Sequence, residues 1–192
     1  MPTRTLYLIR HGQYKHDPDD PREGSLTPLG RRQVKRLARR LRGLPIHAIH
    51  CSTLRRAEET AGILATEFPS LEVQPATILQ ECVPGLPSLF AEHFTQKYPA
   101  EVIEQGRRQA ETAFRRYFRR THNLDRAELV ICHGNIIRYL VCRSIGAPPA
   151  NWVSFDIRNA GLCEITIDST GRITLLAFND TGHLPASLLT FV

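Results

Sequence analysis

The sequence contains no long apolar segment and no recognisable targeting segment. Its 192 residues include no uninterrupted apolar run approaching about 18 residues, the length that a membrane-spanning helix needs. Residues 1–9 lack both the apolar stretch of a signal peptide and the amphipathic pattern of a transit helix. We therefore expect a cytoplasmic protein with no membrane partner.

Cysteine is too scarce and too scattered to form a disulfide framework. The five cysteines are odd in number and show no CxxC spacing, and no HExxH motif is present, so neither disulfides nor a zinc site is indicated. The composition, with 42% hydrophobic and 23% charged residues, excludes a disordered chain. We expect residues 1–192 to form a single domain with its own core.

Lysine is nearly absent, and the formal charge of +6 comes from arginine. The arginines gather in residues 31–42 and again in residues 107–120, both on predicted helices. In the first helix the apolar residues recur at helical spacing, which leaves the arginines on the solvated side. A solvated face is the simpler interpretation, and a patch for anionic partners is the other. Nucleic acid binding is not favoured, because no recognition motif or interleaved aromatic residue accompanies the charge.

Strand and helix patterns alternate along most of the chain, which predicts an α/β domain. Thr27 and Pro28 form a helix start and Gly43 a helix stop. Pro and Gly residues predict a loop over 78–99, with one short helical turn around Phe90. The expected strands are 4–10, 47–52, 71–75, 128–132, 153–158, 162–168 and 172–179, and the expected helices are 28–42, 54–68, 101–121 and 136–145.

Polar residues with reactive side chains follow several of the predicted strands. Arg10 and His11 end the first strand, Arg56 comes shortly after the second, Glu81 after the third and His133 after the strand that ends at 132. In an open α/β sheet, ligands bind beyond the carboxyl ends of the strands. If these strands are parallel, the five side chains converge on one crevice.

Together these side chains can transfer a phosphoryl group. An uncrowded imidazole nitrogen is a nucleophile near neutral pH, guanidinium groups hold a phosphate dianion with forked donors, and a carboxylic acid can protonate a departing alkoxide. We also predict that Gly12 leaves a backbone group near the imidazole of His11 and so fixes the tautomer in which the other nitrogen attacks.

Several motifs, in order along the chain, resemble those of the histidine phosphatase superfamily, the phosphoglycerate-mutase-like proteins. They are Leu8–Gly12, Leu26–Gly30, Ser52–Thr60 and His133–Asn135. The resemblance implies a three-layer α/β/α sandwich with a mostly parallel central sheet. It also implies a phosphohistidine on His11, Glu81 as the acid, and binding of the phosphoryl group by Arg10, Arg56 and His133, with no metal or other cofactor.

Two further features bear on the substrate. Segments 132–143 and 179–185 resemble the serine/threonine protein phosphatases of the family, which implies phosphorylated proteins or peptides rather than only small molecules. The connection after Glu81 is short, and a site without a lid retains a phosphohistidine poorly, so hydrolysis is expected rather than mutase chemistry. Asp17 stands near the place where many members have an asparagine, which leaves that phosphate contact open.

Other interpretations remain at this point. Cys132 and Arg138 satisfy the C-x5-R spacing of cysteine-dependent phosphatases, although about 0.6 such matches are expected by chance in this chain. Two more are a catalytically inactive phosphate-binding scaffold and a metal-dependent hydrolase that uses His11, His133 and nearby carboxylates. The apolar tail 184–192 can cover either the core or a partner subunit in a homo-oligomer.

Overall fold

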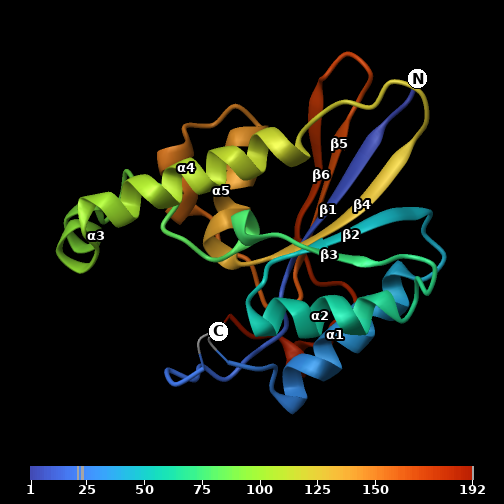
Figure 1. The fold of residues 1–192 in the computed structure, drawn as a ribbon, viewed down its shortest axis with the longest axis horizontal. Helices are drawn as coiled ribbons and strands as arrows, with labels where there is room; N and C mark the ends of the chain where they lie inside the picture. Colours follow the sequence, from blue (N-terminus) through green and yellow to red (C-terminus); the bar gives the residue numbers. More distant parts are fainter. Residues whose placement is uncertain (21, 23, 192) are drawn as a thin grey trace.

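A six-stranded sheet forms the centre of the computed structural model, which describes residues 1–20, 22 and 24–191 (Figure 1). The strand order is β3-β2-β4-β1-β5-β6. The strands β3, β2, β4 and β1 are parallel, and β5 is antiparallel to both of its neighbours. The strands are β1 (Arg4–Arg10), β2 (Ile46–Cys51), β3 (Val73–Pro75), β4 (Arg126–Cys132), β5 (Leu162–Ile167) and β6 (Ile173–Asp180).

Helices cover both faces of this sheet, as Figure 1 shows. They are α1 (Pro28–Leu41), α2 (Arg55–Ala65), α3 (Ala91–Lys97), α4 (Ala100–Tyr117) and α5 (Gly134–Ser144), with short 3-10 helices η1 (Thr77–Leu79), η2 (Pro149–Ser154) and η3 (Ala186–Leu188). Residues in β1 alternate between the two cores. Leu6 and Leu8 pack with α4 and α5, and Ile9 packs with α1 and α2. The predicted three-layer α/β/α fold is confirmed.

Helix α1 begins and ends where its sequence signals predict. The Thr27 hydroxyl accepts a hydrogen bond from the Gly30 N–H at 3.0 Å, and Pro28 occupies the first turn. Gly43 follows the helix with φ 81°, a conformation that favours glycine. Val34 and Leu37 are fully buried against the sheet, so the arginines of this helix face solvent.

The predicted strand at 153–158 is wrong. Its first part belongs to η2, which begins at Pro149 directly after Pro148, and the rest is irregular. The alternating pattern misled because the backbone here binds side chains instead of a neighbouring strand. The Ile157 carbonyl accepts a hydrogen bond from Arg10, and the Phe155 carbonyl accepts one from Arg138.

Two other segments refine the sequence interpretation. The turn expected around Phe90 is the start of α3, a seven-residue helix with no buried residue, so it carries no periodic pattern to detect. In the tail, Leu184 and Leu188 are buried, and the Leu188 carbonyl accepts a hydrogen bond from the Gln33 amide at 2.7 Å. The tail therefore covers the α1 side of the core. Val192 lies outside the described residues.

The carboxyl ends of β1 and β4 meet at one point. Arg10 pairs with Cys132 across the two parallel strands, and the His11 N–H donates to the Cys132 carbonyl at 3.1 Å. The helix that follows β1 lies on one face of the sheet and the helix that follows β4 on the other (Figure 1). Such a switch point is where α/β sheets bind ligands. Within the described ranges, no helix is both long and apolar enough to cross a bilayer.

Candidate active site

His11 lies directly beyond the end of β1 and is only 2% exposed. Its Nδ1 is 2.8 Å from the Gly12 carbonyl oxygen, a distance that requires Nδ1–H as the donor. The Arg56 Nε–H donates to His11 Nε2 at 3.2 Å. The Gly12 carbonyl favours the predicted tautomer, in which the proton is on Nδ1 and the lone pair is on Nε2.

The surroundings of His11 keep the imidazole neutral. Burial lowers its pKa well below 6.5, and the nearby guanidinium of Arg56 lowers it further, against the opposing effect of the Gly12 carbonyl. A neutral imidazole that carries no proton on Nε2 is the nucleophilic form.

Close backbone contacts, rather than unusual backbone angles, explain the glycines of the first two motifs. A Cβ on Gly12 would lie 2.7 Å from the Gly30 carbonyl oxygen, and a Cβ on Gly30 would lie 1.9 Å from the Gln13 carbonyl oxygen. The start of α1 therefore packs directly on the loop that follows His11. The motifs are separated in sequence but form one close contact.

Arg56 is the second residue of α2, and its side chain packs against an aromatic ring. Its guanidinium carbon lies 4.4 Å from the centre of the Tyr14 ring, and the Tyr14 ring meets His11 edge-on at 5.1 Å between centroids. Thr60, one turn along the helix, accepts a hydrogen bond from the Gly12 N–H at 3.2 Å and donates to the Arg56 carbonyl at 2.7 Å. The Arg-Ala-x-x-Thr pattern thus joins α2 to the His11 loop.

Arg10 approaches the same point from the last residue of β1. Its Nη1 donates to the Ile157 carbonyl at 2.5 Å, whereas its buried Nε–H has no hydrogen-bond partner. A Cβ on Gly134 would contact this Nε at 3.5 Å, so the glycine at the start of α5 keeps the region beside the guanidinium open.

His133 faces His11, with 5.0 Å between ring centroids, and is fully buried. Its Nε2 lies 2.8 Å from the Ser52 hydroxyl oxygen, and its Nδ1 has no partner. The Ser52 hydroxyl also accepts a hydrogen bond from the Leu54 N–H at 3.2 Å. Burial lowers the pKa of His133 well below 6.5, and the neighbouring His11 and Arg56 lower it further.

Glu81 lies after η1 and is held by two backbone N–H groups. Cys82 donates to its Oε1 at 3.2 Å, and Asn135, in the first turn of α5, donates to its Oε2 at 3.4 Å. Burial raises the pKa of Glu81, although both N–H groups and the positive charges of Arg10 and Arg56 oppose the increase. The carboxyl group therefore keeps its proton at higher pH than an exposed glutamate.

The structure thus brings the five predicted residues together. His11, Arg56 and His133 are in direct or ring-to-ring contact, and Glu81 and Arg10 influence each other's charge. Among the residues that the structure describes, Asp17 makes no hydrogen bond or ion pair with any of these five. It is exposed, and its carboxylate accepts a hydrogen bond from the Asp19 N–H at 3.1 Å within its own turn.

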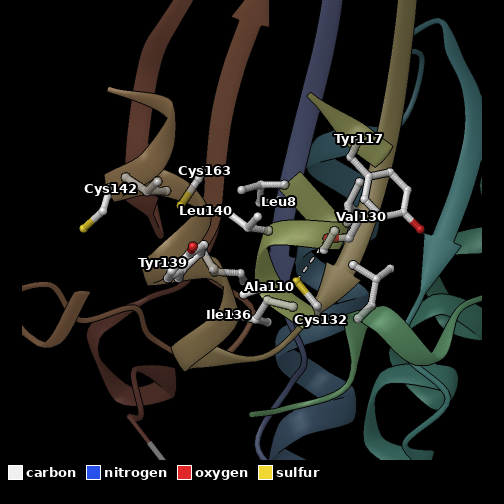
Figure 2. Close-up of a cluster of buried hydrophobic side chains, with 14 of the residues drawn as sticks. Leu8, Ala110, Tyr117, Val130, Cys132, Ile136, Tyr139, Leu140, Cys142 and Cys163 are labelled. Carbon is white, nitrogen blue, oxygen red and sulfur yellow. Dashed lines mark hydrogen bonds between the residues drawn. The ribbon is translucent and has the colours of Figure 1, made fainter. Parts of the chain in front are cut away.

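The cysteine-based alternative conflicts with the position of Cys132. Figure 2 shows its sulfur within the apolar cluster, close to Ala110 and Ile136. Burial raises the pKa of this thiol well above 9.0, so it is not a thiolate. The side chain of Arg138 is bound to the Phe155 carbonyl and to Asn135. Among the residues that the structure describes, no three His, Cys, Asp or Glu side chains form a group that could hold a metal ion.

Sequence reasoning did not identify three residues that support this site. Tyr14 contacts Arg56 and His11, Ser52 binds His133, and Asn135 binds Glu81 through its backbone. All three lie inside the quoted segments or directly beside them. Their position in or beside the motifs was a signal that they belong to the site. Their partners lie on other helices, strands and loops, so the contacts themselves could not be deduced from the spacing of residues along the chain.

A profile of the histidine phosphatase superfamily (branch 1) matches residues 6–181. This chain belongs to the histidine phosphatase superfamily. Two solved structures share the fold. A phosphoglycerate mutase from Plasmodium falciparum has a TM-score of 0.67 and 25% identity, covering 97% of this chain and 96% of that one. A phosphoserine phosphatase from Entamoeba histolytica has a TM-score of 0.71 and 21% identity, covering 95% and 100%.

The chain is also similar to curated phosphatases of this superfamily. The mitochondrial serine/threonine-protein phosphatase PGAM5 of Homo sapiens is 35% identical over 193 residues, covering 98% of this chain and 66% of the relative, and the Mus musculus protein gives the same values. The chain therefore spans about two thirds of the length of these relatives. The predicted resemblance to serine/threonine phosphatases is confirmed. The predicted cytoplasmic location is contradicted, because these relatives are named as mitochondrial proteins.

Proposed function

We propose that residues 1–192 form a single catalytic domain that hydrolyses phosphomonoesters through a phosphohistidine on His11, without a metal ion. The observation that carries this proposal is the His11 imidazole itself. Its Nδ1 proton is held by the Gly12 carbonyl, and its Nε2 is 3.2 Å from a guanidinium nitrogen of Arg56. An oxyanion bound by that guanidinium places phosphorus next to the nucleophilic nitrogen.

In the first step, Nε2 of His11 forms a bond to phosphorus and the bond between phosphorus and the ester oxygen breaks. The leaving alkoxide takes the proton of Glu81, whose raised pKa keeps that proton available. Arg10 and Arg56 hold the phosphoryl oxygens, and the unpartnered Arg10 Nε–H supplies one of the donors. The clustered positive charge performs the neutralising role that metal ions have in other phosphoryl-transfer sites.

In the second step, water attacks the phosphohistidine and Glu81, now a carboxylate, takes a proton from that water. The bond between His11 and phosphorus breaks and inorganic phosphate leaves. His133 contributes Nδ1–H as a further donor in the tautomer in which the Ser52 hydroxyl donates to Nε2. Ser52 is then a positioning residue for that histidine.

Phosphoserine or phosphothreonine in proteins or peptides is the substrate that we propose. The support is the 35% identity to phosphatases named for that activity. A small phosphorylated molecule is the second candidate. It is favoured by the shared fold with a phosphoglycerate mutase and a phosphoserine phosphatase. The phosphotransferase alternative differs from hydrolysis only in the acceptor, which is a second substrate rather than water.

The test measures turnover of p-nitrophenyl phosphate in excess chelator by wild type, His11→Ala and Cys132→Ser. We expect loss of turnover only in His11→Ala. Loss only in Cys132→Ser, or activity that needs added metal, would contradict the mechanism. A radiolabelled adduct that is labile to acid and resistant to base identifies the phosphohistidine directly. Comparison of phosphopeptides with small phosphate esters by kcat/KM then decides between the two substrate classes.

A further inference from the structure

A large cavity lies at the opposite end of the sheet from His11. It measures about 1040 Å³ and is formed where β1 and β4 begin, together with the end of α4 and the loop 119–125 that follows it. Strands β1 and β4 run the full distance between this cavity and the crevice that holds His11 and His133. The cavity is therefore separate from the candidate active site.

Positive charge dominates the cavity lining. Five arginines face two carboxylates, and the two carboxylates are Asp125 and Glu128. Glu128 is 1% exposed and already pairs with Arg4 and Arg126. The lining arginines are Arg4, Arg116, Arg119, Arg120 and Arg126.

Three of these arginines lack a carboxylate partner among the described residues. Arg119 donates to the Arg116 carbonyl at 2.9 Å, and Arg120 reaches the Ser169 carbonyl at 3.5 Å. The Arg116 guanidinium lies 5.7 Å from the centre of the Tyr117 ring. Backbone carbonyls and an aromatic face leave most of their forked donors available for an anion.

Three buried polar atoms in the same lining also have no partner, namely the Tyr117 hydroxyl, Arg4 Nε and His50 Nδ1, and the first two are donors. The Tyr117 side chain is 1% exposed, and its hydroxyl makes no hydrogen bond. Figure 2 shows that hydroxyl directed away from the apolar cluster in which the ring is packed. Burial raises the pKa of Tyr117 to about 12, so the hydroxyl remains a donor at neutral pH. Arg4 Nε–H is likewise buried and unpaired. Buried polar groups are nearly always satisfied, so these two donors point to an absent acceptor.

We propose that this cavity binds a small anion that carries a chain of phosphate groups. Forked guanidinium donors match phosphate oxygens in geometry, and a cluster of arginines can hold several linked phosphate groups. A cavity of about 1040 Å³ is large enough for a nucleotide-sized ligand. The shared chemistry is the polyphosphate, which either a nucleoside triphosphate or an inorganic polyphosphate supplies. This inference does not depend on the proposed phosphatase activity.

The first test titrates the full chain with inorganic tripolyphosphate by calorimetry. The variant Arg116→Glu/Arg120→Glu reverses two charges in the cavity lining. The matched control Arg32→Glu/Arg36→Glu reverses two exposed charges on α1. We expect binding to weaken at least about 10-fold in the first variant and less than about 2-fold in the control. Turnover of p-nitrophenyl phosphate is expected to stay unchanged in both variants.

Two results would overturn the site. Equal weakening in both double variants shows that only overall charge matters. Binding that survives in Arg116→Glu/Arg120→Glu and disappears in Arg56→Ala places the anion in the catalytic crevice alone. Thermal unfolding of each variant confirms that the comparison is made between folded proteins.

The second test removes only the buried hydroxyl. Tyr117→Phe keeps the packed ring, so the protein is expected to fold, and tripolyphosphate affinity is expected to fall about 3- to 10-fold. Tyr98→Phe, beside α3, is the control and leaves the affinity unchanged. Unchanged affinity in Tyr117→Phe contradicts the proposed contact. Tighter binding of ATP than of tripolyphosphate supports a nucleotide ligand at this site, and equal affinity supports an inorganic polyphosphate.

Discussion

At the carboxyl ends of β1 and β4, arginines surround two buried imidazoles, whereas at the amino ends of the same strands arginines surround a buried carboxylate. The pKa of His11 is lowered by burial and by Arg56. At the other end, burial opposes ionisation of Glu128, but hydrogen bonds from His50 and the arginines outweigh it and lower the pKa of Glu128 to about 2. Similar side chains therefore give a neutral nucleophile at one end and an ion-pair network at the other.

The difference lies in which anion balances the arginines. Glu128 is ionised and neutralises Arg4 and Arg126 within the fold. Burial raises the pKa of Glu81, the carboxyl group near Arg10 and Arg56, so Glu81 keeps its proton to higher pH than an exposed glutamate does. The catalytic crevice thus retains positive charge for a phosphoryl group. At the amino ends, the ion pairs of Glu128 with Arg4 and Arg126 contribute to the stability of the fold.

Among the substitutions that test this comparison, that of Arg56 is expected to have the largest effect on activity. Arg56→Ala removes the donor next to His11 Nε2 and is expected to lower kcat/KM for p-nitrophenyl phosphate about 10²- to 10³-fold. The matched control is its neighbour Arg55, which pairs with Asp20 at 3.2 Å instead of facing the crevice. Arg55→Ala is expected to change kcat/KM less than about 3-fold. Equal losses in the two variants would show that the effect comes from general charge.

Substitution of Glu128 tests the opposite end. Glu128→Gln leaves Arg4 and Arg126 without their buried partner and is expected to lower the free energy of unfolding by about 3 kcal/mol, measured with denaturant at neutral pH. Activity of the folded variant at 25 °C is expected to remain close to that of wild type.

The pH dependence of that stability has a defined sign. The folded-state pKa of Glu128 is about 2, below the ordinary value of 4.5, so its contribution is complete above pH 4.5 and is lost as the pH falls toward 2. Glu104 is the control, since Arg107 and Arg108 also lower its pKa to about 2 but its side chain is 41% exposed. Glu104→Gln is expected to leave unfolding nearly unchanged. A comparable loss in both variants contradicts the importance of burial.

Substitution of Glu81 tests which form of the carboxyl group acts in the crevice. Glu81→Gln is expected to reduce kcat about 10²-fold for alkyl phosphates and much less for p-nitrophenyl phosphate, whose leaving group needs no proton. In wild type, turnover of alkyl phosphates is expected to fall as the pH rises through the raised pKa of Glu81. Equal losses for aryl and alkyl esters exclude Glu81 as the acid.

Ser52 is expected to have the smallest effect. Ser52→Ala removes the hydrogen bond to His133 Nε2 and is expected to lower kcat/KM about 3- to 10-fold, because the imidazole loses its orientation but stays in place. Ser52→Cys keeps a weak donor and is expected to recover part of the loss. A variant Ser52→Ala with wild-type kinetics shows that packing alone orients His133.

Much of the fold and the identity of the site residues could be predicted from local signals. Thr27, Pro28 and Gly43 define α1 because caps and stops act through neighbouring backbone groups. His11 and His133 were predicted to meet because parallel strands end at one edge of a sheet, and the register of β1 with β4 places them side by side.

What could not be predicted depends on contacts between distant segments. The pattern at 153–158 predicted a strand, but its carbonyls bind Arg10 and Arg138 instead. For the second arginine cluster, a solvated face was the simpler interpretation and a patch for anionic partners the other. Its proximity to Arg4, which begins the first strand, arises only when the end of α4 packs beside β1 and β4. The residue pattern within one helix does not show which distant strand its end will contact.

The hydrogen bond from Arg56 to His11 Nε2 implies that the resting protein protects its own nucleophile. A neutral electrophile such as diethyl pyrocarbonate meets a lone pair that is already occupied, so we expect slow modification of His11. A phosphate ester carries oxyanions that attract the guanidinium and release the ring as they bind. The contact between these two side chains therefore favours reaction of His11 with anionic phosphate esters over reaction with neutral reagents.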